Sequence, residues 1–123
     1  NPLDFTFGFP PTLSVSNTDS LGELIQRAYP ELMVIKTLNT MNAALMVEPN
    51  RVQGDHNVFI SGDHEVAKEE VKEILRSFGW HDRNILDLGD ISTARGTEML
   101  LPLWTRLYGK FEDVNFNFKI VRN

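Results

Sequence analysis

A chain of 123 residues fits one domain of ordinary size, and its 41% hydrophobic and 24% charged residues are typical of a globular protein. The net charge of −5, with twelve scattered basic residues, argues against nucleic acid or an anionic membrane surface as a partner. Without cysteine, the chain has no disulfide, no thiolate nucleophile and no cysteine metal site, which is compatible with a cytoplasmic location. No apolar run approaches the roughly 20 residues of a membrane span.

Residues 1–19 have no regular period and no helix cap, and residues 1–11 hold three phenylalanines and three prolines. We expect a loop whose aromatic side chains cover a neighbouring apolar surface. Because the chain begins at Asn1 without an initiator methionine, we interpret it as part of a longer protein.

The first helix is predicted from a capping box at Ser20 and Glu23, in which each residue would satisfy the backbone amide of the other. Its apolar stripe is Leu21, Leu24, Ile25 and Ala28, and Pro30 ends it. Residues 33–38 then form an apolar run, partly β-branched, which predicts a strand buried on both faces of a sheet.

After a helical turn near residues 42–47 and a polar loop over 48–56, a second buried strand is predicted at 57–62. Asp63 is expected to cap a long amphipathic helix that Gly79 ends. Its apolar stripe consists of Ala67, Val71, Ile74, Leu75 and Phe78. Residues 84–89 are predicted to form a third strand.

A last helix should follow Asp90, with Leu100, Leu103, Trp104, Leu107 and Phe111 as its stripe and a kink at Pro102. Residues 116–121 alternate in polarity, as in an edge strand of either direction. Strands separated by helices of these lengths predict an α/β fold with a mostly parallel sheet and flanking helices.

In such sheets, ligands bind beyond the carboxyl ends of the strands. Asn39 and Thr40 occupy that position after the first strand, and their side chains suit an uncharged polar group such as a carboxamide. Alternatively, Asn39 only turns the chain and Thr40 only caps the next helix. Arg95 and Glu98, three residues apart on the last helix, are most simply read as an ion pair.

The common catalytic and nucleotide-binding motifs are not found in the sequence. There is no Gly-x-Gly-x-x-Gly, no P-loop and no Gly-x-Ser-x-Gly. His56, His64 and His81 lack metal-ligand spacing, so we expect no metal site. A self-contained nucleotide site of the usual kind is therefore missing.

An ordered series of segments nevertheless resembles a known family. The segments are Asn1-Pro2-Leu3, Lys36-Thr37-Leu38-Asn39-Thr40, residues 58–63, residues 87–95 with Glu98, and Phe118-Lys119-Ile120. Together they resemble the C-terminal half of the NADP oxidoreductases that depend on coenzyme F-420, a deazaflavin, and the wider group of dinucleotide-binding enzymes. The resemblance covers nearly the whole chain and lacks the family's N-terminal βαβ unit with its Gly-rich loop.

The resemblance implies a partial Rossmann-type fold, with residues 1–123 as the C-terminal part of one NADP-binding oxidoreductase. By position, it implies that Asn1 and Pro2 lie near the nicotinamide ribose, and that Asn39 and Thr40 lie at the second redox ring or the carboxamide. It also implies that the turn Gly89, Asp90, Ile91 and Ser92 lines the substrate cleft. Deazaflavin-using members carry a histidine at the position of Asn39, so the acceptor, flavin or deazaflavin, stays open.

Two hypotheses follow. In the first, the chain is part of an NADP-dependent oxidoreductase, inactive alone, that transfers hydride between NADP(H) and a flavin- or deazaflavin-type acceptor. In the second, it is a catalytically silent α/β module that supplies dimer or other interaction contacts through Trp104, Tyr108 and Phe111. Core packing is the simpler reading of that aromatic stripe.

Overall fold

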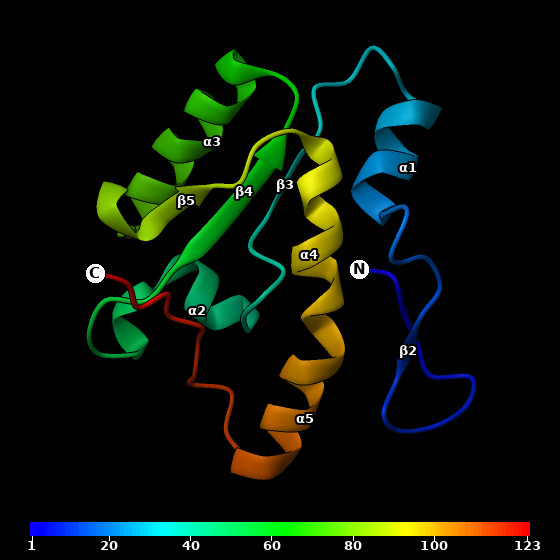
Figure 1. The fold of residues 1–123 in the computed structure, drawn as a ribbon. Helices are drawn as coiled ribbons and strands as arrows, with labels where there is room; N and C mark the ends of the chain where they lie inside the picture. Colours follow the sequence, from blue (N-terminus) through cyan, green and yellow to red (C-terminus); the bar gives the residue numbers. More distant parts are fainter.

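The computed structural model of the chain describes residues 1–123 and has a three-stranded sheet between two layers of helices (Figure 1). The strands are β3 (Ile35–Thr37), β4 (Val58–Gly62) and β5 (Ile85–Asp87), in the order β3-β4-β5. Helices α2 (Ala43–Val47) and α3 (Glu65–Phe78) lie on one side of the sheet and α4 (Ala94–Met99) on the other. This arrangement confirms the predicted α/β fold, a partial Rossmann-like one.

The directions of the strands correct one part of the prediction. β4 and β5 are parallel, with Val58 opposite Ile85, but β3 runs antiparallel to β4, with Ile35 opposite Gly62. The expectation of a mostly parallel sheet is therefore wrong for the β3–β4 pair. β3 and β5 both end opposite Ile60, but the chain leaves β3 toward the Val58 end of β4 and leaves β5 toward the Gly62 end, and this separation matters for the site below.

Every residue of β4 is buried, so this strand is the centre of the molecule. Because side chains alternate along a strand, Val58 and Ile60 face α2 and α3. There they join a core of seven buried side chains: Met41, Leu45, Val58, Ile60, Leu75, Trp80 and Ile85. Ser61 faces the other layer, where the Thr93 hydroxyl donates to its Oγ at 2.7 Å. β4 thus joins both layers of helices.

The long helix α3 begins and ends largely as its sequence predicts. Gly79 at its carboxyl end has φ of +107° and donates to the carbonyl of Arg76. The cap at the other end differs, because His64 is the N-cap residue and Asp63 instead accepts from the Ile91 amide at 2.9 Å. Ile74, placed in the apolar stripe, is 52% exposed.

The last predicted helix is two helices. α4 ends at Met99, and α5 (Leu101–Phe111) begins with Pro102 in its first turn, where the missing amide costs no hydrogen bond. The interruption lies at Leu100, which keeps helical backbone angles, two residues before the predicted kink at Pro102. Short 3-10 turns lie at Pro49–Arg51, Asp82–Asn84 and Ile91–Thr93.

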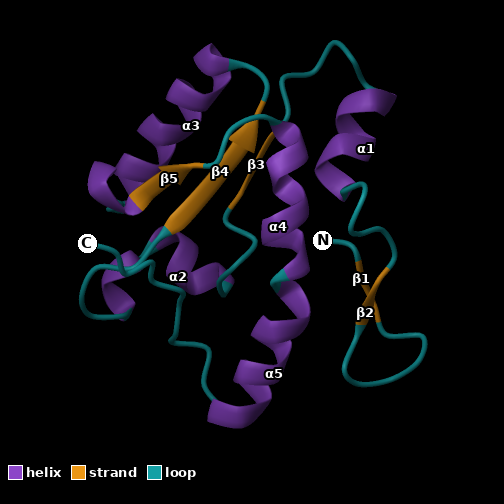
Figure 2. Ribbon diagram, in the orientation of Figure 1, coloured by secondary structure: helices purple, strands orange, loops and turns teal.

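Two terminal segments differ from prediction (Figure 2). Residues 1–19 were expected to be all loop, but β1 (Leu3–Asp4) and β2 (Thr12–Leu13) form a short antiparallel pair. The aromatic side chains of this segment cover little, since Phe5, Phe7 and Phe9 are 54%, 84% and 59% exposed. Residues 116–121 are not a strand. This segment is held at Asn57, whose amide donates to the Phe118 carbonyl and whose side chain accepts from the Ile120 amide.

α1 (Leu21–Ala28) forms where its capping box predicts, but its apolar stripe faces outward. Leu24 and Ile25 are each 39% exposed, whereas Gly22 and Glu23 are buried. The stripe is therefore largely uncovered within these 123 residues. No helix of the structure is both long enough and apolar enough to cross a membrane.

Candidate active site

A mostly apolar cavity of about 380 Å³ lies between the N-terminal segment, the carboxyl end of β3 and helix α5. Seven of its ten lining residues are hydrophobic. The lining residues are Asn1, Leu3, Phe5, Phe9, Asn39, Met41, Leu101, Trp104, Thr105 and Tyr108. Apolar walls with a few convergent polar groups are the usual composition of a small-molecule site.

Asn39 is 9% exposed and is held by a specific contact. Its Nδ2 donates to the Thr97 carbonyl of α4 at 3.0 Å. The preceding residue, Leu38, has φ of +66°, a left-handed conformation that non-glycine residues rarely adopt. This turn directs the chain away from β3 and places Asn39 against α4. Asn39 is therefore both a turn residue and a fixed wall of the cavity.

Asn1 reaches the same cavity from the opposite side. The Lys36 ammonium of β3 donates to its side-chain Oδ1 at 3.3 Å. Pro2 is buried and its carbonyl accepts from the Ser14 amide at 2.8 Å, which holds the hairpin closed. The structure thus brings Asn1 and Asn39, two of the four predicted cofactor-binding residues, to one cavity.

The other predicted residues lie elsewhere. Thr40 is 2% exposed and does not line the cavity, and Asn42, not Thr40, caps α2 through its side chain. The turn Gly89–Ser92 follows β5, at the far end of β4, so it does not line this cavity either. The antiparallel direction of β3 is the reason for the separation.

The Gly89–Ser92 turn is anchored from α3. Lys68, only 2% exposed, donates to the Gly89 carbonyl at 2.7 Å and to Asp87 at 3.0 Å. Burial alone would lower the pKa of Lys68, but the hydrogen bond and charge of Asp87, with that of Glu65, raise it overall. Hydrogen bonds from Ser92 lower the pKa of Asp90, whose side chain caps the following turn. These contacts hold the turn against α3 and β5.

An ion pair joins the N-terminal turn of α1 to α4. The predicted Arg95–Glu98 pair is wrong, because Arg95 instead donates two hydrogen bonds to Glu23, at 2.9 and 2.6 Å. These bonds hold the pKa of the Glu23 carboxyl below its usual range, against the opposing effect of burial. The Glu23 amide donates to the Ser20 hydroxyl, as the capping box predicts. The Glu23 carboxylate, however, accepts from the Ser20 hydroxyl and not from the Ser20 amide, so only half of the capping box forms.

Glu98 is 1% exposed and pairs with Lys36 at 3.2 Å. Sequence reasoning missed both residues as parts of the site. One signal was present in the sequence, because Glu98 directly precedes the apolar run Met99-Leu100-Leu101. A carboxylate that is buried together with such a run needs a partner.

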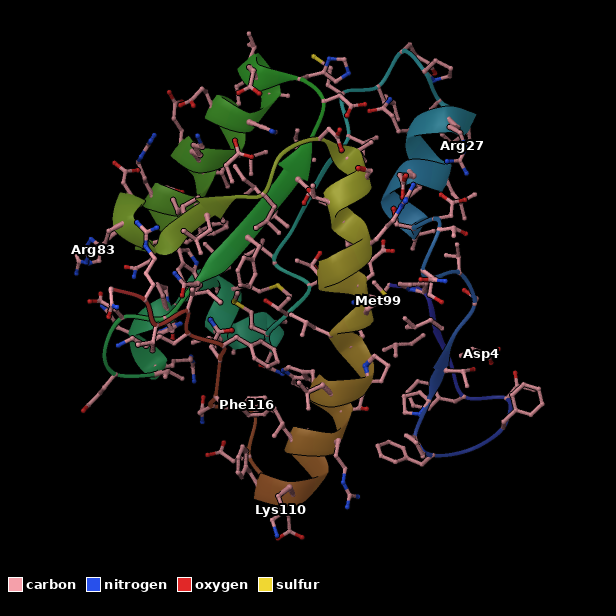
Figure 3. All side chains as sticks on the ribbon, in the orientation of Figure 1. Asp4, Arg27, Arg83, Met99, Lys110 and Phe116 are labelled. Atoms are coloured by element: carbon pink, nitrogen blue, oxygen red, sulfur yellow. The ribbon has the colours of Figure 1, made fainter.

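Trp104 forms the α5 wall of the cavity. It stacks on Tyr108 with ring centroids 5.6 Å apart and on Phe116, labelled in Figure 3, at 5.4 Å. Its indole Nε1 is buried without a hydrogen-bond partner. A buried donor without a partner costs about 1–3 kcal/mol, and a ligand carbonyl could satisfy it.

A second cavity, of about 360 Å³, is more polar and less suited to a redox ring. Its most buried polar side chain, His56, is already satisfied. Nε2 lies 2.9 and 3.2 Å from the carbonyl oxygens of Pro49 and Val52, and Nδ1 lies 2.8 Å from the side-chain amide nitrogen of Asn117. We interpret His56 as a structural contact that holds the C-terminal segment.

Two known proteins are similar to this chain. A solved structure from Arthrobacter sp. FB24, described as a proposed F420-dependent NADP-reductase, is 61% identical over 99% of this chain, with a TM-score of 0.93. This similarity confirms the resemblance to the F420-dependent NADP oxidoreductases. It spans 55% of that neighbour's chain. The rat metalloreductase STEAP3 is 33% identical over 95 residues, which are 73% of this chain and 18% of STEAP3. No family model matches the sequence.

Proposed function

We propose that the chain is the redox-ring side of an NADP-dependent oxidoreductase, which transfers hydride between NADP(H) and a flavin- or deazaflavin-type acceptor. One observation carries this proposal. An apolar cavity with two amide side chains, Asn1 and Asn39, lies at the carboxyl end of β3 in a chain 61% identical to a proposed F420-dependent NADP-reductase.

The chemistry needs little more than such a cavity. Hydride passes directly between two rings held at contact distance, so the protein has to orient the rings and exclude water. The apolar lining residues are suited to both tasks, and Asn1 and Asn39 offer hydrogen bonds to an uncharged carboxamide. NADP would supply the nicotinamide ring that carries the hydride. Asn1 and Asn39 would hold that ring by its carboxamide edge.

None of the ten cavity residues is lysine or arginine, so the cavity itself has no cation for a phosphate. The chain spans about half of the solved neighbour and a fifth of STEAP3. We propose that the diphosphate binds to the remaining part of a longer protein, to which residues 1–123 contribute the C-terminal part.

The surface beside β3 suits contact with that remaining part. β3 pairs with β4 along one edge only, so its other edge is free in the three-stranded sheet. Exposed apolar side chains lie close to it in sequence, on α1 and the following segment: Leu24, Ile25, Tyr29, Leu32 and Met33. Apolar patches of this kind mark interfaces more often than free surface.

Replacing Asn39 with alanine in the full-length protein tests the function. We expect hydride transfer to slow by about tenfold or more while NADPH binding weakens less, because Asn39 would orient the ring without holding the phosphates. Stopped-flow kinetics and NADPH fluorescence titration separate the two effects. Asn50→Ala, at an exposed position, is the matched control. An unchanged transfer rate in a folded Asn39→Ala protein would leave Asn39 as a turn residue only.

A second role, as a dimer contact, has a separate observation in its favour. Leu103, Tyr108 and Phe111 on α5 are 47%, 47% and 55% exposed. We propose that this face contributes to a homodimer. Sedimentation at increasing protein concentration tests it, and a mass that stays monomeric throughout would contradict it.

A further inference from the structure

Lys36 lies in the middle of β3 and makes two contacts that the proposed hydride transfer does not itself require. Its ammonium is 3.2 Å from Glu98 Oε1 and 3.3 Å from Asn1 Oδ1, and its side chain is only 14% exposed. It therefore connects a buried carboxylate to a cavity residue.

Glu98 is fixed in place by the backbone of α1. Its two carboxylate oxygens accept from the Leu21 amide at 2.8 Å and the Gly22 amide at 3.1 Å. Gly22 favours this close approach, because a Cβ there would come within 3.2 Å of the Ile91 side chain and 3.4 Å of Ala94, and a neighbour would have to shift. With Glu98 held this firmly, the position of the Lys36 ammonium is also set.

This arrangement fixes which way the Asn1 amide faces. An ammonium can only donate, so Asn1 must turn its Oδ1 toward Lys36, and its Nδ2 remains as a free donor. Asn39 is fixed in the opposite sense. The Thr97 carbonyl can only accept, so Asn39 turns its Nδ2 there and keeps its Oδ1 as a free acceptor. The cavity therefore has one oriented donor and one oriented acceptor.

We propose that Lys36, anchored by Glu98, is a positioning residue that holds the Asn1 amide as a donor, so that the cavity selects a neutral carboxamide. The carboxamide oxygen accepts from Asn1 Nδ2, and its NH₂ group donates to Asn39 Oδ1. This inference rests on the proposed function and adds the polarity with which the nicotinamide is recognised.

The test compares NADPH with its reduced thionicotinamide analogue, whose sulfur is a weaker acceptor than the carboxamide oxygen. We expect the full-length protein without substitutions to bind NADPH about three- to tenfold more tightly than the analogue. This difference in affinity corresponds to the free energy of one hydrogen bond. Lys36→Met should reduce this preference to within about twofold, because Asn1 is then free to turn. Lys36→Arg, which still donates and pairs with Glu98, should retain it.

Lys72→Met is the matched control, because Lys72 also pairs with a glutamate, Glu69 at 3.0 Å, but on α3. It should keep the full preference. A purely structural effect of Lys36→Met would weaken both ligands equally and leave their ratio unchanged, and that result would overturn the inference. If Lys36→Met does not fold, Asn1→Asp gives the same test, because it removes the donor and retains a partner for Lys36. A preference that survives in Asn1→Asp would also overturn it.

The failure of the inference differs from the failure of the proposed function. If Lys36→Met binds NADPH and keeps the affinity ratio between NADPH and the analogue, only the positioning role is contradicted. Failure of the unmodified full-length protein to bind NADPH removes both.

Discussion

The two sides of the β3–β4 pair differ in how their apolar side chains are used. On β4, Val58 and Ile60 are completely buried between two layers of helices. On α1 and the segment that leads to β3, side chains of the same kind are 39% to 56% exposed: Leu24, Ile25, Tyr29, Leu32 and Met33. The comparison teaches that one half of the sheet has a complete core, whereas the other half presents a face suited to a further layer.

Polar side chains follow the same division. Near β4 and β5, the ammonium of the buried Lys68 donates to Asp87 and to the Gly89 carbonyl, and so holds the turn that follows β5. Near β3, the buried Glu98 and the half-buried Lys36 hold Asn1 at a cavity wall, where the Asn1 Nδ2 and the Trp104 Nε1 have no protein partner. The unpaired donors collect on the side whose apolar face is also uncovered. We therefore propose that the functional site lies at β3.

The largest expected effect lies in the complete core. Ile60→Ala should lower the free energy of unfolding of the chain by about 2–5 kcal/mol, because the removed atoms leave a cavity in a layer that cannot collapse around it. Urea unfolding followed by circular dichroism measures the change. A loss below about 1 kcal/mol would show that β4 is not the centre of the core.

Ile25→Ala is the matched change on the uncovered side. In the 123-residue chain it should cost under about 1 kcal/mol, since Ile25 already contacts water. In the full-length protein the cost should rise toward the range of a buried isoleucine, if the remaining part covers α1. The same urea titration on both proteins gives the difference. Equal costs in the two would mean that α1 stays exposed and that the missing layer lies elsewhere.

The smallest effect is the response to acid at the boundary between the two sides. Glu23 has a folded pKa below its ordinary value of 4.5 because Arg95 hydrogen-bonds its carboxylate. Its contribution to stability is therefore complete above that ordinary value and is lost as the pH falls through the lowered pKa. Glu23→Gln should flatten this part of the stability profile between pH 5 and about pH 3. A profile as steep as that of the unmodified chain would assign the acid sensitivity to other carboxylates.

Local sequence patterns predicted the elements well, and long-range relations poorly. Ser20 marked the start of α1, Gly79 marked the end of α3, and Pro102 marked a break, because each signal acts within one turn of backbone. The direction of β3 could not be read in this way. Its apolar run is equally compatible with either direction, and the choice depends on pairing with residues 60–62.

The candidate site shows the same difference between local signals, which could be predicted, and long-range contacts, which could not. Asn39 was found because it directly follows an apolar strand, and Asn1 because of the family resemblance. The Lys36–Glu98 pair joins residues 62 positions apart, and α1 amides complete it, so no spacing rule could indicate it. Arg95 and Glu98 looked like partners at helical spacing, but each found a better-placed partner on another element.

The most direct test of the account is NADPH fluorescence titration of the 123-residue chain and of the full-length protein side by side, with circular dichroism to confirm that both are folded. The account predicts binding to the full-length protein only, because residues 1–123 provide the ring side of a cavity whose lining has no cation for the phosphates. Tight binding of NADPH to the 123-residue chain alone would contradict it.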